Sequence, residues 1–325
     1  MSSTERLGGS VSAGSYDVAV LVPCHNEERT IARVVADFRT ALPKAMVYVY
    51  DNNSSDRTID LATEAGAVVR AEIRQGKGHV VRRMFSDIEA DVYVLVDGDA
   101  TYDAASAPTM VAMLIKDRLD MLVAARLDRE EAAYRRGHRA GNWLLTRVVT
   151  YIFGRAFTDI LSGYRVFSRR FVKSFPGLSR GFEIETELTV HALELELPVK
   201  ELATPYYSRP PGSASKLSTW DDGFRILRTI LKLYRAERPL QFFGSIGLLL
   251  VVVSVALAIP ILITYFREGL VPRLPTAVLS TGLMLLGFLS IAVGLILDTV
   301  TRGRHEAKLI AYLAFRAPGE KRSQK

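Results

Sequence analysis

The chain has 325 residues, 49% of them hydrophobic, and a formal net charge of +7, which allows a substantial globular core plus a further segment. Its single cysteine, Cys24, excludes an intrachain disulfide and a metal site built from several thiolates, and is typical of a reducing compartment. The basic charge comes without a nucleic-acid recognition module, so we expect attraction to lipid headgroups and no nucleic-acid partner. In chain order, residues 1–16 come first; they are rich in Ser and Gly, lack an apolar signal core, and predict a disordered tail.

From Val18 onward, short β-branched runs alternate with amphipathic helical patterns. The runs predict strands at 18–23, 46–51 and 92–97, separated by helices that include 28–42 and 56–65. This alternation predicts an α/β domain over residues 17–219, with a doubly wound, mostly parallel sheet. Because ligands bind such sheets beyond the carboxyl ends of the strands, the polar residues that follow each strand are candidate site residues.

Two carboxylates, Asp97 and Asp99, flank Gly98 directly after the third predicted strand. They repel each other unless a cation lies between them or one is protonated. Mg²⁺ or Mn²⁺ takes hard oxygen ligands from one or two carboxylates plus substrate phosphates, and a glycine lets a bulky ligand approach the backbone. We therefore predict a divalent metal site at Asp97 and Asp99.

The second strand ends at Asp51 and Asn52, whose carboxylate and amide suit hydrogen bonding to a nucleobase or ribose. Asp56 is predicted to cap the following helix. Lys77 lies between two glycines in the string RQGKGH, which lacks the spacing of a phosphate-binding P-loop. Two interpretations stay open for it: a cation beside a diphosphate, or an ordinary surface turn.

In this order and spacing, the strings VPCHNEE, VYDNNSSDRT, GKG and VDGD resemble the donor half of family 2 glycosyltransferases with a GT-A fold. The resemblance covers most of residues 17–235 and implies a nucleotide-sugar donor. It places Asp97 and Asp99 at the metal and diphosphate, and it implies a donor-binding set of Pro23, His25, Glu27, Asp51, Asn52, Lys77, Gly98 and Arg209. The chain departs from the usual strings at His25, where the family has Tyr, and at Asn52, where it has a second Asp, so the base stays undetermined.

Later motifs bear on the acceptor. Together with two apolar spans they resemble the polyprenyl-phosphate glycosyltransferases, the group that includes dolichol-phosphate mannosyltransferases. The motifs carry Arg126, Arg139, Asp159, Arg165, Arg209, Ser213, Ser215 and Lys216. The resemblance implies that Arg126 and Arg139, with Ser215, hold the acceptor phosphate, and that the loop ending at Lys216 folds over the donor and stabilises the departing nucleoside diphosphate.

A physical argument also favours a phosphate acceptor. A sugar hydroxyl must lose a proton to attack, whereas a phosphate monoester is already an anion at neutral pH. The predicted reaction is direct displacement at the anomeric carbon with inversion, by an undecaprenyl or dolichyl phosphate. Glu183 and Glu185 keep three interpretations: a general base for a hydroxyl acceptor, contacts to the donor sugar, or acids in the first turn of a helix. The alternatives are transfer to a sugar hydroxyl in polysaccharide synthesis and a non-catalytic membrane scaffold.

The C-terminal third predicts a membrane anchor. Residues 220–238 fit an amphipathic helix in the membrane interface or a surface helix, and residues 298–325 form a basic tail. Between them, Leu240–Phe266 and Leu274–Leu297 are each long enough to cross about 30 Å of hydrocarbon. Basic residues flank this pair and are sparse in the short link, so the positive-inside rule places both termini and the catalytic domain in the cytoplasm, at a bacterial or archaeal-type inner membrane. Small residues in the spans leave a homo-oligomer possible.

Overall fold

The computed structural model describes residues 16–128, 147, 157–178, 181, 183–208, 228, 231–232 and 234–319. The chain divides into two compact units. The first comprises Met1–Gly223 together with Lys308–Lys325, and the second comprises Phe224–Ala307.

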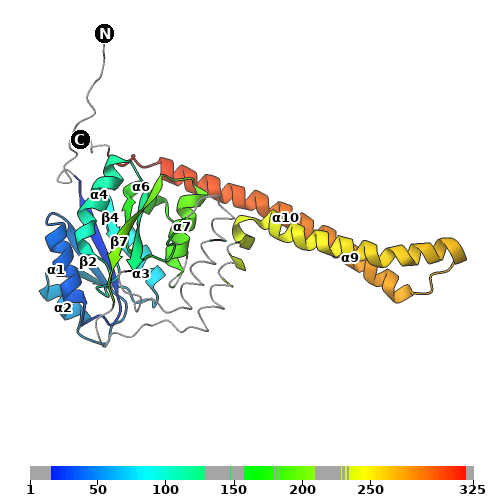
Figure 1. The fold of residues 1–325 in the computed structure, drawn as a ribbon, viewed down its shortest axis with the longest axis horizontal. Helices are drawn as coiled ribbons and strands as arrows, with labels where there is room; N and C mark the ends of the chain where they lie inside the picture. The colour runs from blue at the N-terminus through cyan, green and yellow to red at the C-terminus, as the bar shows by residue number, and fades with distance from the viewer. Residues whose placement is uncertain are drawn as a thin grey trace, which may run out of the picture. The chain divides into compact units, whose positions relative to one another are not determined.

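The first unit is built on a seven-stranded sheet with the order β3-β2-β1-β4-β6-β5-β7. Figure 1 labels its strands β2, β4 and β7. All neighbouring strands are parallel except β6, which runs antiparallel to both β4 and β5. The mostly parallel sheet predicted from the sequence is confirmed, with one reversed strand inside it. The strands are β1 Val18–Cys24, β2 Met46–Asp51, β3 Val68–Ala71, β4 Val92–Leu95, β5 Met121–Asp128, β6 Arg165–Ser168 and β7 Val199–Tyr206.

Helices cover both faces of this sheet, as a doubly wound fold requires. On one face, Val34 of α1 and Met110 of α4 join the same buried cluster as Val94 of β4. On the other face, Phe85 of α3 contacts Tyr93, the neighbour of Val94 along β4, with ring centroids 6.2 Å apart. This alternation of side chains along β4 is the period of two expected for a strand buried on both sides. The helices are α1 Ile31–Ala41, α2 Thr58–Glu64, α3 Lys77–Asp87, α4 Ala107–Lys116, α6 Arg169–Ser174 and α7 Ile184–Glu194, with a short 3₁₀ helix, η2 Ala104–Ser106.

The carboxyl ends of the parallel strands meet at one edge of the sheet. Cys24, the last residue of β1, is in register with Asp51, the last residue of β2. Beyond them, the Asn52 N–H donates to the Cys24 carbonyl at 2.8 Å. On the other side of β1, the Val96 N–H donates to the Leu21 carbonyl at 3.0 Å, just beyond the end of β4. The polar residues that follow β1, β2 and β4 therefore gather at a single edge.

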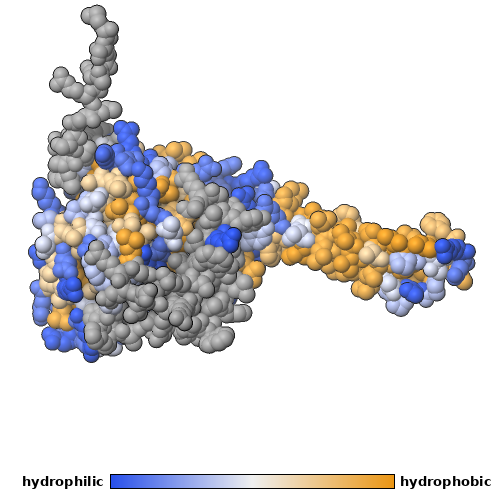
Figure 2. All heavy atoms as spheres, viewed as in Figure 1, coloured by the Kyte–Doolittle hydropathy of each residue, from blue (hydrophilic) through white to orange (hydrophobic). Residues whose placement is uncertain are grey.

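The second unit consists mainly of α9 Pro239–Glu268 and α10 Leu274–Leu313, both long and apolar enough to cross a membrane. The two predicted spans lie inside these helices, and α10 continues past the predicted end. Apolar side chains dominate the visible surface of the pair (Figure 2). The last residues of α10, from Lys308, belong to the first unit, where the Tyr312 hydroxyl donates to Asp120 Oδ2 at 2.9 Å. The interfacial helix predicted at 220–238 falls largely outside the described residues.

Close packing and hydrogen bonds hold α9 and α10 together. A side chain at Gly247 would lie 2.6 Å from the Gly287 carbonyl, so only glycine fits there. Ser254 and Ser280 exchange hydrogen bonds, each hydroxyl donating to the other residue's carbonyl, at 2.7 and 2.9 Å. Small residues and hydroxyl pairs of this kind are typical of membrane helix contacts.

Candidate active site

The acidic pair lies where the sequence predicts it, just beyond β4. Asp99 is buried, and its Oδ1 accepts hydrogen bonds from the Thr101 N–H at 3.2 Å and the Thr101 hydroxyl at 2.6 Å. Gly163 lies so close to Asp97 that any side chain there would overlap the carboxylate. Packing gives Gly98 a second requirement beside the predicted approach of a ligand, because a Cβ at this position would meet the Cys24 sulfur at 2.7 Å.

A lysine lies beside this acidic pair. Lys77 is the first residue of α3, and its ammonium donates to Asp97 Oδ1 at 2.5 Å and also to Glu185 Oε1. Burial lowers the Lys77 pKa, but the two carboxylates outweigh burial and raise it. The ammonium therefore stays charged. Of the two interpretations open for Lys77, the surface turn is excluded, because its side chain is only 10% exposed.

The Asp97 carboxyl has an environment expected of a cation site. Burial raises its pKa to about 6; Lys77 opposes this shift, while Asp99 and Glu185 add to it. One lysine thus does not fully compensate the three acids. Two carboxylates, Asp97 and Asp99, are the oxygen donors that Mg²⁺ or Mn²⁺ takes from a protein when it shares the ion with phosphates. The residues present fit such an ion.

Asp51 and Asn52 occupy the same edge but have different hydrogen bonds. Asp51 is 3% exposed; its Oδ2 accepts from the Ser54 N–H at 3.0 Å, while its buried Oδ1 accepts no hydrogen bond from the described residues. Buried carboxylate oxygens usually accept a hydrogen bond, so this oxygen is a place where a bound ligand can supply the donor. The Asn52 amide, in contrast, is bound by the segment that leads to Lys77.

The tips of β1 and β2 are tied together. The Asn26 N–H donates to the Ser54 hydroxyl at 2.8 Å, and the Glu27 N–H donates to the Thr58 hydroxyl at 2.8 Å. Asp56 accepts from the Glu28 and Thr58 N–H groups, so it ties the two tips together. It is not the N-cap predicted for it, because the N-cap of α2 is Arg57, one position later. These bonds place Pro23 and His25, both half-buried, next to the Asp51 edge.

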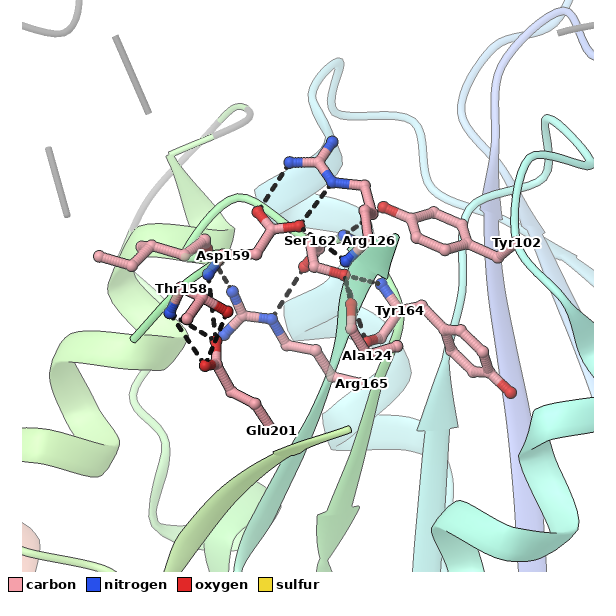
Figure 3. A network of polar contacts seen from close by, with 11 residues as sticks. Tyr102, Ala124, Arg126, Thr158, Asp159, Ser162, Tyr164, Arg165 and Glu201 are labelled. Carbon is pink, nitrogen blue, oxygen red and sulfur yellow. Dashed lines mark hydrogen bonds and ion pairs between the residues drawn. The ribbon is translucent and has the colours of Figure 1, made fainter. Parts of the chain in front are cut away.

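A second polar network surrounds Arg126, at the carboxyl end of β5 (Figure 3). Its Nε and Nη2 donate to the two oxygens of Asp159, at 2.6 and 2.7 Å. The Asp159 backbone is itself held, because its N–H donates to Glu201 Oε1 at 3.1 Å. Arg165, in contrast, is fully buried and donates to the Ile160 and Ser162 carbonyls, so it organises the segment that carries Asp159.

Two tyrosines that no sequence motif marks, Tyr102 and Tyr206, lie beside Arg126. The Arg126 guanidinium lies 5.4 Å from the centroid of the Tyr206 ring, which contacts the Tyr102 ring at 5.3 Å. Burial and the Asp99 charge raise the Tyr206 pKa, and the Arg126 charge opposes them. Asp99 and Arg126 therefore act electrostatically on the same ring.

Glu185 lies in the first turn of α7 and Glu183 is at its N-cap. Of the three interpretations, the first helical turn therefore fits the position of Glu185. Glu185 also binds Lys77, a contact that the sequence does not reveal. Five predicted site residues fall outside the described residues: Arg139, Arg209, Ser213, Ser215 and Lys216.

Comparison with known proteins identifies several relatives. Residues 19–175 match the domain described as Glycosyl transferase family 2. Glycosyltransferase AglJ of Haloferax volcanii is 38% identical over 232 residues, covering 71% of this chain and 76% of the relative. Dolichyl-phosphate hexose transferase of the same organism is 27% identical over 222 residues, covering 68% of this chain and 96% of the relative.

A solved structure shares the fold. Glucosyl-3-phosphoglycerate synthase from Mycobacterium tuberculosis, in complex with Mn²⁺, uridine-diphosphate-glucose and phosphoglyceric acid, has a TM-score of 0.54 and 21% sequence identity. The similarity covers 67% of this chain and 80% of that one.

Proposed function

The chain belongs to glycosyl transferase family 2, and on that premise we propose that it moves one sugar from a nucleotide-sugar to a polyprenyl phosphate, giving a lipid-linked monosaccharide. The donor is GDP-mannose, a UDP-hexose or a UDP-N-acetylhexosamine, and the acceptor is undecaprenyl or dolichyl phosphate. The name of the dolichyl-phosphate hexose transferase relative supports this acceptor class. The observation that carries the proposal is the presence, around Tyr102 and Tyr206, of both an acidic pair and a half-buried arginine that Asp159 orients.

The donor half of the site suits a nucleoside diphosphate. Asp51 offers a buried oxygen with no hydrogen-bond donor among the described residues, which suits an N–H of a base or a hydroxyl of a ribose. Asp97 and Asp99 would hold Mg²⁺ or Mn²⁺, which neutralises the diphosphate of the donor when bound. Lys77 brings a permanent cation to the same place. The Mn²⁺ and uridine-diphosphate-glucose of the structural neighbour support this arrangement.

The acceptor half suits a phosphate. Guanidinium binds phosphate through two parallel hydrogen bonds, and Asp159 fixes the plane of the Arg126 guanidinium. Arg139 and Ser215 complete the proposed phosphate set. Glu185, the acid nearest to Lys77, is engaged with that lysine, which favours an acceptor that needs no general base.

The proposed reaction is a direct displacement with inversion. A phosphate oxygen of the lipid forms a bond to the anomeric carbon as the bond from that carbon to the diphosphate oxygen breaks. Arg126 holds the incoming anion against the repulsion of the donor. Lys77 and Lys216 stabilise the charge that develops on the departing nucleoside diphosphate.

The membrane location of the acceptor matches the two apolar helices. We propose that α9 and α10 span the membrane with both termini and the catalytic unit on the cytoplasmic side of a bacterial or archaeal-type inner membrane, because basic residues flank the pair. Nucleotide-sugars would then reach the site from the cytosol.

The test is an assay of membranes that contain the full-length protein, with radiolabelled nucleotide-sugars and either undecaprenyl or dolichyl phosphate. The expected product is a single-sugar lipid that forms only with a divalent metal. A labelled polymer would instead indicate transfer to sugar hydroxyls, and no labelled product with any donor, together with no metal-dependent nucleotide binding, would indicate a scaffold.

A further inference from the structure

The Asn52 side chain, directly after β2, makes three hydrogen bonds to one segment of backbone. Its Nδ2 donates to the Glu72 and Arg74 carbonyls, both at 2.8 Å, and its Oδ1 accepts from the Gly76 N–H at 2.7 Å. The residue is only 4% exposed. Its amide is thus committed to the loop Glu72–Gly76, which connects β3 to α3.

The chemistry of these bonds requires an amide. A carboxylate accepts hydrogen bonds but donates none, so aspartate at position 52 would place negative oxygens against two carbonyls. This explains why the chain has Asn where the family string has a second Asp. The fixed loop then turns at Gly76, whose φ of 127° lies in the region that favours glycine.

The loop leads directly to Lys77, the cation that contacts Asp97 of the proposed metal site. Gly76 is the N-cap of α3, and the next residue is Lys77, whose ammonium reaches Asp97 and Glu185. Asn52 therefore holds the backbone one residue before Lys77. The free hydrogen-bonding capacity at this edge belongs to its neighbour Asp51, whose Oδ1 is buried without a hydrogen bond from the described residues.

We infer that Asn52 is a positioning residue: it anchors the loop Glu72–Gly76 so that Lys77 is presented to the diphosphate of the donor, and it does not contact the base or the ribose. The inference rests on the proposed function, because it requires a diphosphate ligand. It also replaces the nucleoside-binding role that the sequence predicts for Asn52.

Inorganic pyrophosphate separates a role of Asn52 in positioning Lys77 from a role in binding the nucleoside, because pyrophosphate has neither base nor ribose. The full-length protein in detergent is titrated calorimetrically with Mn²⁺ plus pyrophosphate, and with Mn²⁺ plus UDP or GDP. We expect Asn52→Asp and Asn52→Ala to weaken pyrophosphate and nucleoside diphosphate by the same factor, about tenfold. Lys77→Met should cause a similar loss, and the double variant Asn52→Asp with Lys77→Met should lose little more than Lys77→Met alone.

Two controls isolate the effect. Gln75→Glu adds the same negative charge to the same exposed loop, and its side chain can still accept the Asn53 amide bond, so its affinities should stay within about twofold of the wild type. Hydrogen exchange without any ligand should show faster exchange of the Gly76 amide in Asn52→Ala, which removes the acceptor of this N–H, and unchanged exchange in Gln75→Glu.

Three outcomes overturn the inference. The first is a loss of nucleoside diphosphate affinity in the Asn52 variants, either with unchanged pyrophosphate affinity or with a wild-type protein that does not bind pyrophosphate. The second is fully additive losses in the double variant. The third is a Gly76 amide that exchanges at the wild-type rate in Asn52→Ala. A wild-type protein that binds neither ligand overturns the proposed function and the diphosphate part of the inference together. In that case hydrogen exchange still decides whether Asn52 anchors the loop.

Discussion

Arg126 and Asp159 form an ion pair with two parallel hydrogen bonds, Nε to Oδ2 at 2.6 Å and Nη2 to Oδ1 at 2.7 Å. Their side chains are 13% and 8% exposed. Asp159 therefore sets the direction in which the arginine presents its charge. We predict that Asp159→Asn raises the KM for polyprenyl phosphate about tenfold, because a weaker partner leaves the guanidinium less oriented, and changes the donor KM less than about twofold.

Steady-state kinetics with each substrate varied in turn measures both constants. Arg126→Ala should likewise raise the KM for polyprenyl phosphate more than the KM for the donor. It also leaves Asp159 buried without this partner, so it should cost about 3 kcal/mol of stability. Arg126→Lys keeps the charge without the planar fork and serves as the control. An equal rise of both KM values in Asp159→Asn would contradict the assignment.

Asp99→Asn should leave the fold intact and remove turnover. The asparagine carbonyl oxygen can still accept both hydrogen bonds from Thr101, but the charge that we assign to metal binding is gone. We expect turnover to fall about a hundredfold or more, with a thermal midpoint close to that of the wild type. Unfolding of the variant in a thermal melt would show that Asp99 is instead a structural residue.

Glu185→Gln separates the Lys77-holding role of Glu185, which the structure shows, from the general-base interpretation. If Glu185 holds Lys77, its amide replacement should reduce kcat about tenfold and leave the acidic limb of the pH–rate profile in place. If Glu185 is a general base for a hydroxyl acceptor, that limb should disappear. The pH dependence of kcat with polyprenyl phosphate as acceptor is the deciding measurement.

We predict that the catalytic unit loses folding stability in acid because of the buried His191. Burial, with a further contribution from the Lys308 charge, lowers its pKa to about 4. The unfolded chain binds this proton more readily than the folded chain, so stability is fully present above the usual pKa of 6.5 and is lost as pH falls toward 4. The loss attributable to this residue is about 3 kcal/mol.

Thermal melts of the wild type and His191→Gln between pH 7 and 4 test this prediction, since the glutamine variant lacks the titrating group. The unfolding free energy of the wild type, relative to that of His191→Gln, should decrease as the pH falls from 7 to 4. Parallel curves would show that His191 does not control acid stability.

Gly287→Leu should separate α9 from α10, because a Cβ at Gly287 would lie 2.9 Å from the Gly247 carbonyl. Gly282→Leu, on the same helix, is the matched control, since no atom lies within 4 Å of its Cβ position. We expect the free energy of unfolding to fall by about 2 kcal/mol in Gly287→Leu and to change little in Gly282→Leu. Unfolding in detergent, followed by circular dichroism, compares the two, and equal stabilities would mean that the helices do not pack at Gly287.

The sequence predicted those parts of the structure that depend on local pattern. The short apolar runs predicted all of β2, all of β1 except Cys24, and a third strand that covers β4 but extends two residues beyond it. The rule that strand ends gather at one edge brought Asp51 and Asp97 into one site. The short β3, with no fully buried residue, and the reversed β6 have no comparable signal.

Side-chain partners far apart in the chain were not predictable in the same way. Lys77 and Glu185 are separated by 108 positions, and their contact depends on how α3 and α7 pack. Asn52 was expected to bind ligand because its amide is polar and lies at the edge. Its actual partners are backbone carbonyls, which every residue carries and no sequence pattern marks.

The most direct test of the account is the identity of the labelled product formed by the wild-type protein in membranes from a radiolabelled nucleotide-sugar, Mn²⁺ and polyprenyl phosphate. We predict a lipid that carries one sugar through a phosphodiester, absent with Asp99→Asn and reduced with Asp159→Asn. Transfer of the label to a sugar hydroxyl, or equal product without any polyprenyl phosphate, would contradict it.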